Sequence, residues 1–243
     1  MKFYRIRHSL SDKQLGRIPQ VKDVKISSSV DNPKFLGEIF FSEIDFDPIV
    51  PEIVLFDDSK LTDLIEKIMV VSLKLLVSEK LKSLIQLYRT EGVQFFRNRV
   101  FHNELEYNNY WFLHTYCFNE DYIDFNRSTI VLEKKADDYE TSFMTSNVEV
   151  NIESIEDFEI LKTSSQKKFE TLYIKNLFFK DVDENFFAIR YVEGGIGYFV
   201  SEKLKNEIEE AGCTGIEFQP SELSYHEWVV SGGERERVYG RSW

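Results

Sequence analysis

The six-residue segment VSEKLK occurs twice in this chain, at 77–82 and again 123 positions later at 200–205. A match that continues in register beyond the shared segment indicates a duplicated structural unit. We therefore expect the same local fold twice, around 73–96 and around 196–219. Without a gap, the same offset pairs further identical residues: Ile85 with Ile208, Gly92 with Gly215, and Phe95 with Phe218.

Each copy has the pattern of a strand, a helix and a second strand. A short apolar run precedes each serine, as expected of a buried strand. Ser78 and Ser201 are suited to cap a helix N-terminus, since a serine oxygen can accept from a free N–H of the first turn. Glu79 and Glu202 follow where negative charge favours the helix dipole. These serines are therefore interpreted as helix starts and not as nucleophiles.

The predicted helices each carry one apolar stripe, because their apolar residues recur at spacings of three and four. Gly212 is suited to end the second helix, and Gly92 and Gly215 precede short alternating segments that favour strands. The stripe residues are Leu81, Leu84, Ile85 and Tyr88 in the first copy and Leu204, Ile208 and Ala211 in the second.

The remaining pattern is mainly β, so the predicted class is α+β with mostly antiparallel or mixed sheets. One further helix is predicted over Ser59–Met69, where four apolar residues share one face. Strands are predicted at Phe3–Ile6, Phe35–Phe41, Tyr110–Phe118, Thr129–Glu133, Leu172–Phe179 and Phe186–Val192.

The repeat suggests two halves, 1–140 and 141–243, which either pack closely as one compact domain or form separate lobes. We favour close packing. Polar stretches at Lys134–Tyr139 and Thr163–Lys168 are the expected soft points, and the Gly- and Arg-rich tail from Ser231 to Trp243 is expected to be mobile.

The formal net charge of −12 disfavours direct nucleic-acid binding, because phosphate recognition depends on Lys and Arg. The same charge attracts a basic partner by long-range steering, although it could also serve solubility alone.

Cys117 and Cys213 are too few for a disulfide framework. The charged N-terminal segment lacks a signal sequence's apolar core, and no apolar run is long enough to span a bilayer, so we expect a cytoplasmic protein with no membrane partner.

Familiar catalytic and metal-binding spacings are missing from the sequence. His226-Glu227 has no second histidine for HExxH, and His102-Asn103-Glu104 has no PCxxC partner. His8, His102, His114 and His226 are interpreted as surface or strand residues. No catalytic residue, cofactor or metal ligand is predicted.

Three other features have simple structural interpretations. Glu193–Gly197 is Gly-rich but matches no phosphate-loop motif, so a turn between two strands is preferred. The acid pairs Asp45 with Asp47 and Asp121 with Asp124 are expected by chance among 42 acidic residues. The aromatic cluster is expected to form the packed face of a sheet; its members are Tyr107, Tyr110, Trp111, Phe112, Tyr116 and Phe118.

The repeated segment, followed by a helix and then Gly-x-x-Phe, resembles the signature of a bacterial polymorphic-toxin immunity protein family, the group named for a Myxococcus protein and formerly of unknown function. The second copy is the stronger match, with SEKLK at 201–205, EEAG at 209–212 and TGIEF at 214–218. The central YWFL at 110–113 and YIDFNRS at 122–128 also resemble this family. The resemblance spans roughly Asp58–Pro220.

The resemblance implies a protein that binds a cognate secreted toxin and neutralises it by occlusion, without catalysis. If that toxin is a nuclease, its surface should be basic. The resemblance supplies no contact residue, so the partner-binding residues and the oligomeric state remain open. Two alternatives stay open: a hydrolase or nucleotide-modifying enzyme whose site assembles from distant residues, and a structural adaptor.

Overall fold

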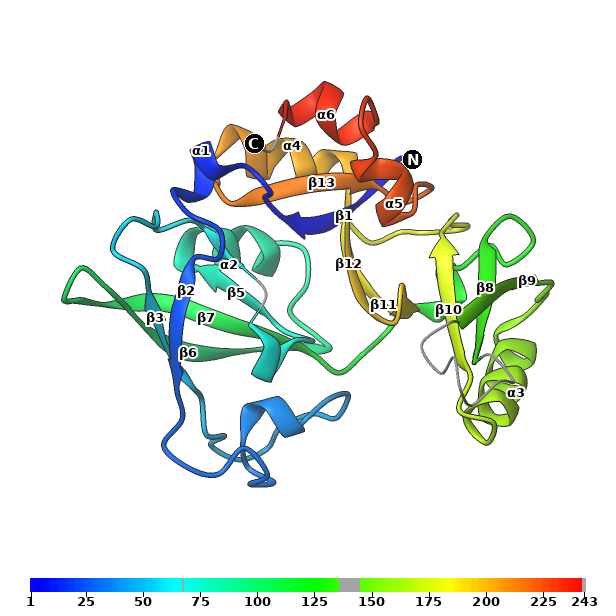
Figure 1. Cartoon of the computed structure of the whole chain (residues 1–243), viewed down its shortest axis with the longest axis horizontal. Helices are drawn as coiled ribbons and strands as arrows, with labels where there is room; N and C mark the ends of the chain where they lie inside the picture. Colours follow the sequence, from blue (N-terminus) through cyan, green and yellow to red (C-terminus); the bar gives the residue numbers. More distant parts are fainter. Residues whose placement is uncertain (67, 136–144, 242–243) are drawn as a thin grey trace.

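A computed structural model describes residues 1–66, 68–135 and 145–241, which form two mixed sheets with helices packed on and between them (Figure 1). The predicted α+β class with mostly antiparallel and mixed sheets is confirmed. The seven-stranded sheet has the order β13-β1-β12-β11-β10-β8-β9 and the six-stranded sheet the order β2-β3-β6-β7-β5-β4.

The seven-stranded sheet contains β1 (Phe3–His8), β8 (Thr129–Lys135), β9 (Thr145–Val150), β10 (Thr171–Asn176), β11 (Phe186–Val192), β12 (Gly195–Ser201) and β13 (Ile216–Pro220). The six-stranded sheet contains β2 (Val21–Lys25), β3 (Glu52–Leu55), β4 (Leu64–Ile65), β5 (Leu75–Ser78), β6 (Val93–His102) and β7 (Leu105–Thr115). The α-helices are α1 (Asp12–Leu15), α2 (Glu79–Gln86), α3 (Ile155–Gln166), α4 (Glu202–Glu210), α5 (Tyr225–Val229) and α6 (Glu234–Tyr239); three short 3-10 turns are η1 (Leu36–Glu38), η2 (Met69–Val71) and η3 (Glu120–Tyr122).

Both predicted strand-helix-strand units are confirmed, as β5-α2-β6 and β12-α4-β13. In each unit the two strands run parallel and are separated by a third strand antiparallel to both. That middle strand is β7 in the first unit, where it follows β6 along the chain. In the second unit it is β1, from the start of the chain. The repeated units thus complete their sheets with strands from different places in the sequence.

The two units share one core. Apolar side chains of α2 and α4 pack with both sheets in a single cluster that includes Leu81, Ile85, Leu204 and Ile208, all fully buried. The contacts between the helices are reciprocal. Lys80 Nζ donates to Gly212 O at 3.0 Å at the end of α4, and the Lys203 ammonium of α4 lies 5.2 Å from the ring centre of Tyr88, just beyond α2.

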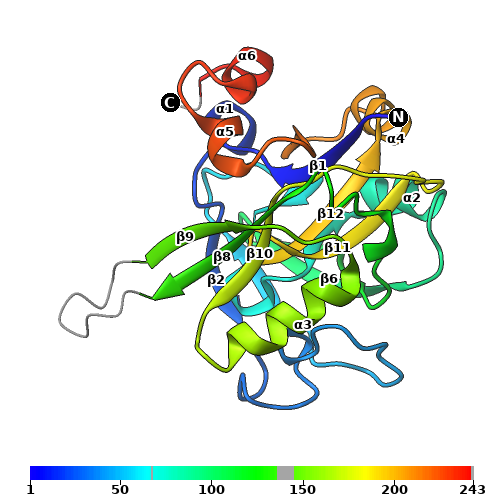
Figure 2. The same ribbon diagram turned by 90° about the vertical axis from the view of Figure 1, so that its right-hand side faces the viewer.

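A second cluster lies between α3 and the β8-β10-β11 part of the seven-stranded sheet, around Phe158, Phe187 and Ile174. Figure 2 shows α3 crossing these strands and the β8–β9 hairpin projecting from the sheet. A third cluster lies on the other face of the six-stranded sheet and is closed by the irregular segment 26–51. It contains Phe35, Leu36 and Phe112.

The helix predicted over Ser59–Met69 is wrong. Its apolar residues have helical spacing, but Leu64 and Ile65 form β4 and pair with Val77 and Leu76. Their side chains point to opposite faces, Leu64 into the core shared by the two units and Ile65 into the third cluster. A strand whose two faces are both covered buries successive residues on opposite sides, which an amphipathic helix does not.

The strand predicted at Phe35–Phe41 is also wrong. Its centre is the 3-10 turn η1, and Gly37 lies so close to the Val70 backbone that a Cβ there would meet its carbonyl oxygen at 2.1 Å. Phe35 and Leu36 are buried as expected of apolar residues, but as a turn packed on the sheet. The other five predicted strands are confirmed as β1, β7, β8, β10 and β11, with small differences in their ends.

Two expected soft segments are structured. Thr163–Gln166 forms the last turn of α3, so the soft point predicted at Thr163–Lys168 is wrong. The tail from Ser231, predicted to be mobile, forms α6 and is held by a buried ion pair between Arg235 and Glu217 at 2.7 Å. In the predicted soft point Lys134–Tyr139, the first two residues belong to β8 and the rest lie outside the described residues.

The proposed division into 1–140 and 141–243 remains a prediction. The strands β1 and β8, from the first range, are hydrogen-bonded into the same sheet as β9 to β13 from the second. Across the described ranges, none of the helices has the length and apolar content that a membrane crossing requires.

Candidate functional site

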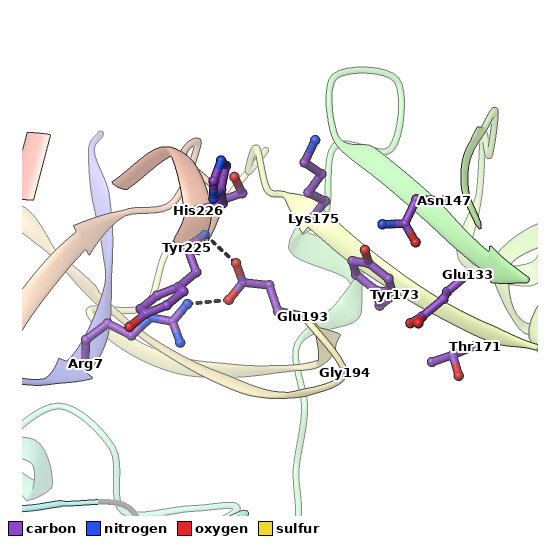
Figure 3. A pocket seen from close by; sticks show the side chains of 11 residues that line it. Arg7, Glu133, Asn147, Thr171, Tyr173, Lys175, Glu193, Gly194, Tyr225 and His226 are labelled. Carbon is purple, nitrogen blue, oxygen red and sulfur yellow. Dashed lines mark hydrogen bonds and ion pairs between the residues drawn. The ribbon is translucent and has the colours of Figure 1, made fainter. Parts of the chain in front are cut away.

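A pocket of about 680 Å³ opens between the β11–β12 turn, the start of α5 and the outer face of β8 and β10 (Figure 3). Positively and negatively charged side chains both line this pocket. The lining residues are Arg7, Lys175, His226, Glu133, Glu193, Tyr173, Tyr225, Asn147, Thr171, Gly194 and Ser224.

The pocket exists because β10 and β11 separate soon after they meet. They are parallel and share the single registered pair Ile174 with Val192. A register shift between Arg190 and Val192 bends β11 at this point, and Tyr191 has a φ of 64°. Bulges of this kind re-aim the following side chain. Here the redirected residue is Glu193, whose own φ is 51°.

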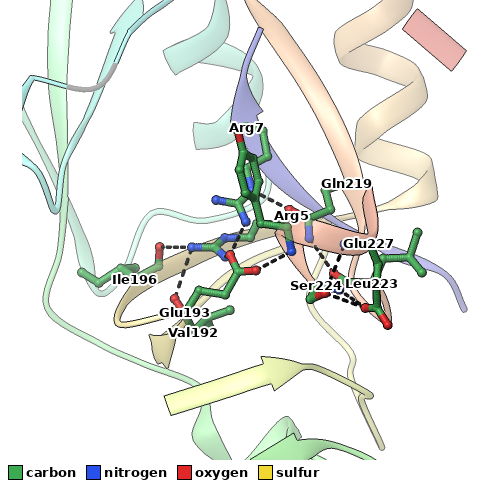
Figure 4. Close-up of polar contacts among 10 residues, drawn as sticks. Arg5, Arg7, Val192, Glu193, Ile196, Gln219, Leu223, Ser224 and Glu227 are labelled. Atoms are coloured by element: carbon green, nitrogen blue, oxygen red, sulfur yellow. Dashed lines mark hydrogen bonds and ion pairs between the residues drawn. The ribbon is translucent and has the colours of Figure 1, made fainter. Parts of the chain in front are cut away.

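Glu193 is the central acceptor of the pocket (Figure 4). Its Oε2 accepts hydrogen bonds from Arg5 Nη1 at 2.6 Å and from Arg7 Nη2, while its Oε1 accepts from the backbone N–H of Tyr225. One carboxylate therefore connects β1, the β11–β12 turn and α5. Because it accepts three hydrogen bonds, two of them from guanidinium groups, Glu193 holds the pocket wall together and is poorly placed to act as a base.

Arg5 lies beneath Glu193 and is buried. Its Nη2 donates to the backbone oxygens of Ile196 at 3.2 Å and Val192 at 3.4 Å. The pKa of Arg5 is lowered to about 9, mainly by burial and then by the nearby charge of Arg7, while Glu193 acts in the opposite direction. Removing Glu193 would leave a buried cation without its counter-charge, which is strongly unfavourable.

The opposite wall is formed by the strands β8, β9 and β10. Glu133 lies opposite Thr171 and Asn147 across these strands. Burial, followed by the charges of Glu133 and Glu193, raises the pKa of Tyr173. Its phenol therefore stays protonated at neutral pH and can donate a hydrogen bond. These groups can hold a polar ligand, but they do not form a nucleophile activated by a base.

His226 reaches the pocket rim from α5. The helix begins with a capping box, in which Ser224 Oγ accepts from Glu227 N at 3.3 Å and Glu227 Oε2 accepts from Ser224 N at 2.8 Å. This cap fixes the first turn, which carries Tyr225 and His226. The Tyr225 ring lies 4.9 Å from the Arg7 guanidinium, so it covers the cation while His226 faces solvent.

A second surface feature is the acidic aromatic loop, defined here as residues 38–47. It contains four carboxylates and three phenylalanines but no Lys or Arg. The three phenylalanines, Phe40, Phe41 and Phe46, are 48%, 43% and 38% exposed. The side chains of Met69 and Val70 lie beside Phe40 around a hollow of about 290 Å³. Adjacent exposed aromatic residues on one loop are a feature of protein-binding surfaces.

The residues singled out in the sequence have mostly structural positions. Ser78 and Ser201 are confirmed as helix caps. The Gly-rich segment forms the predicted turn between two strands at Glu193-Gly194 and then begins β12, although nothing in its sequence signalled that Glu193 would organise a pocket. His8, His102 and His114 lie on strands.

The aromatic cluster is in part a packed sheet face, with Tyr110 and Phe112 buried. Asp45 and Asp47 belong to the acidic aromatic loop, whereas Asp121 lies in η3. Burial raises the pKa of the Cys213 thiol to about 11, so this cysteine is a poor nucleophile. Within the described ranges, no group of three or more His, Cys, Asp or Glu side chains is arranged to hold a metal ion.

No protein-family model matches this chain, and no curated protein matches it either.

Proposed function

We propose that this protein is a non-catalytic binding protein that neutralises a secreted bacterial protein toxin by covering the toxin's functional surface. The observation that carries the proposal is the acidic aromatic loop. Its exposed phenylalanines supply apolar area that can be buried in a complex, and its four carboxylates supply charge. Buried aromatic residues usually carry the binding energy of an interface, while peripheral charges mainly set the association rate.

Two further observations support the same function. The net charge of −12 favours encounter with a basic protein, such as a toxin that itself binds nucleic acid. The segments 201–205, 209–212 and 214–218 resemble the immunity family signature. In the fold these segments build α4 and the start of β13, so the resemblance concerns the scaffold that supports the binding surface.

The resemblance implies that the toxin is encoded beside this gene, and co-expression with that neighbouring product tests the proposal. We expect growth to be restored, and we expect the two purified proteins to elute as one complex on a sizing column. The association rate should fall as salt is raised, because steering between opposite charges is screened. Failure to protect cells together with separate elution would contradict the proposed function.

Turnover of a small molecule would indicate the enzymatic alternative. Such chemistry would be located in the Glu193 pocket, whose rim groups Lys175 and His226 are available to a ligand. A purified chain with activity that is abolished by Lys175→Met or His226→Ala, with its folding unchanged, would replace the toxin-binding proposal.

A further inference from the structure

The acidic aromatic loop is part of a long connection without regular structure. Between β2 and β3 the chain runs from residue 26 to residue 51 with η1 as its one helical turn, and a single β-bridge joins Phe35 to Ile49. Connections of this length inside a compact fold are uncommon, and those that persist usually have a function. The segment forms one end of the six-stranded half (Figure 1).

Three polar side chains from in and beside the six-stranded sheet form hydrogen bonds to the backbone of this loop. Lys74 Nζ donates to Ile39 O at 2.7 Å, and His114 Nε2 lies 2.8 Å from Ser42 O. Gln94 makes two bonds to one residue: its Oε1 accepts from Ile44 N at 2.9 Å and its Nε2 donates to Ile44 O at 2.8 Å.

Two of these three side chains are ionisable and almost completely buried. Lys74 and His114 are 4% and 1% exposed. Burial lowers the pKa of Lys74 to about 8 and that of His114 to about 4. Burying such groups costs free energy unless each makes a hydrogen bond, and here each bonds a carbonyl oxygen of the loop.

The supports produce a short arch. Ile39 and Ile44 point inward and are 9% and 5% exposed, whereas every residue from Phe40 to Glu43 is exposed. The arch therefore holds two neighbouring phenylalanines toward solvent on a backbone that is fixed at both ends. An anchor that is ordered before binding loses less conformational entropy in the complex.

The apolar surface of the arch continues toward the seven-stranded sheet. The ring of Phe41 packs edge-on against Phe118, with centroids 5.6 Å apart. The Arg190 guanidinium of β11 lies 5.2 Å from the Phe118 ring and bonds Glu120 Oε1 through Nε at 2.6 Å. This face thus combines the arch, the connection after β7, and β11 of the seven-stranded sheet. Of the cations beside it, Arg190 is paired with Glu120, and the Lys34 ammonium lies 5.9 Å from the Phe46 ring.

We propose that the Phe40–Phe41 arch is the anchor that inserts into an apolar depression on a basic protein, and that Glu38, Glu43, Asp45 and Asp47 contact lysines and arginines around that depression. The proposal rests on the proposed toxin-neutralising function and identifies the surface that performs it. A basic protein is the occupant that complements four carboxylates without a cation among them.

The test compares two double variants of the full chain against the toxin encoded beside the gene. Phe40→Ala with Phe41→Ala removes the anchor. Leu105→Ala with Ile160→Ala is the matched control, since these side chains are 59% and 70% exposed on β7 and α3. We expect at least a 100-fold rise in Kd for the anchor variant and less than a threefold change for the control. Both should retain the parent's circular dichroism spectrum.

A second variant tests the charges. Glu43→Lys with Asp45→Lys should slow association at least tenfold at low salt and weaken its salt dependence, while dissociation changes less. Kinetics measured on immobilised toxin separate the two rates. An unchanged association rate would contradict the placement of the cationic groups.

The outcomes distinguish the two proposals. If the parent chain neither binds nor neutralises the toxin, the proposed function fails and this inference fails with it. If the parent binds and the anchor variant binds equally well, the function stands and the assignment of the surface is wrong. If the parent alone elutes as a dimer that the anchor substitutions dissociate, the arch serves self-association, which also overturns the inference.

Discussion

Ser78 and Ser201 form the same set of hydrogen bonds in the two repeats. Each hydroxyl oxygen accepts from the third residue of its helix at 3.2 Å. Each also donates at 2.6 Å to a side-chain oxygen on the segment before the neighbouring strand, Asp63 in the first unit and Asn185 in the second. The duplication thus extends beyond the residues that are identical in sequence, to a carboxylate and an amide that play the same part.

Replacing Ser201 with alanine should lower the free energy of unfolding by about 1–2 kcal/mol, because a helix cap and the partly buried hydrogen bond to Asn185 are lost together. Ser78→Ala should cost a similar amount. Chemical denaturation measures both changes. Ser164→Ala, on the exposed surface of α3, is the control and should change stability by less than about 0.5 kcal/mol. A negligible effect at Ser201 would mean that the cap does not stabilise α4.

Stability should fall as the pH is lowered from about 6.5 toward 4, with His114 as one cause. Burial is the main reason that the pKa of His114 is lowered to about 4, and the charge of Lys74 acts in the same direction. The unfolded chain takes up this proton near pH 6.5 while the folded chain does not, so the stability present above pH 6.5 is lost as the pH falls. The full effect is roughly 3 kcal/mol.

His114→Gln is the comparison for this pH effect, because its side-chain amide can still donate to Ser42 O without titrating. Its unfolding free energy should depend less steeply on pH between 6.5 and 5 than that of the parent. Equal slopes for the two proteins would show that His114 does not carry the effect.

Arg235→Leu should destabilise the protein by about 3–5 kcal/mol, since it leaves the fully buried carboxylate of Glu217 without its counter-charge. The guanidinium bonds both oxygens of Glu217 at 2.7 Å. Arg237→Leu removes a charge from the same helix, but its side chain is 70% exposed, so thermal unfolding should be nearly unchanged. Similar melting temperatures for both variants would contradict this assignment.

Gln94→Leu should loosen the arch without altering its phenylalanines. Both hydrogen bonds to Ile44 are lost, so its amide should exchange with solvent faster, which hydrogen exchange followed by mass spectrometry can detect. If the arch must be ordered for binding, toxin affinity should fall about tenfold even though no contact residue has changed. Thr115→Val, on the neighbouring strand β7, is a control that leaves these bonds intact.

Local signals in the sequence predicted much of the fold. The repeat, the serine caps and five strands could be found because each depends on residues close together in the chain. The position of β1 as the middle strand of the second unit could not be predicted, since the pairing of Phe3 with Ser201 leaves no local pattern. The periodicity at Leu64 and Ile65 was misleading because two residues buried on opposite faces resemble a helical stripe when other apolar residues flank them.

The candidate sites were harder to predict than the fold. In the sequence, Glu193 is an acidic residue beside a predicted turn and has no other distinguishing feature. Its role in the pocket depends on ion pairs with Arg5 and Arg7, which lie more than 180 positions earlier in the chain. The acidic aromatic loop was not recognised in the sequence, because the apolar residues at Phe35–Phe41 suggested a strand and Asp45 with Asp47 looked like a chance pair. Only the supports from Lys74, Gln94 and His114 distinguish an ordered arch from a buried strand, and these lie 30 or more residues away.

The position of β1 between β12 and β13 sets an order of events during synthesis. Of the strands described, β1 leaves the ribosome first and its partners β12 and β13 leave last, so β1 must wait unpaired until the strands between them have emerged. The six-stranded half has no such requirement, because β2 to β7 are contiguous in sequence. Closure of the seven-stranded sheet therefore joins β1 to the two described strands that are made last, and any co-translational intermediate must protect β1 from pairing with other chains.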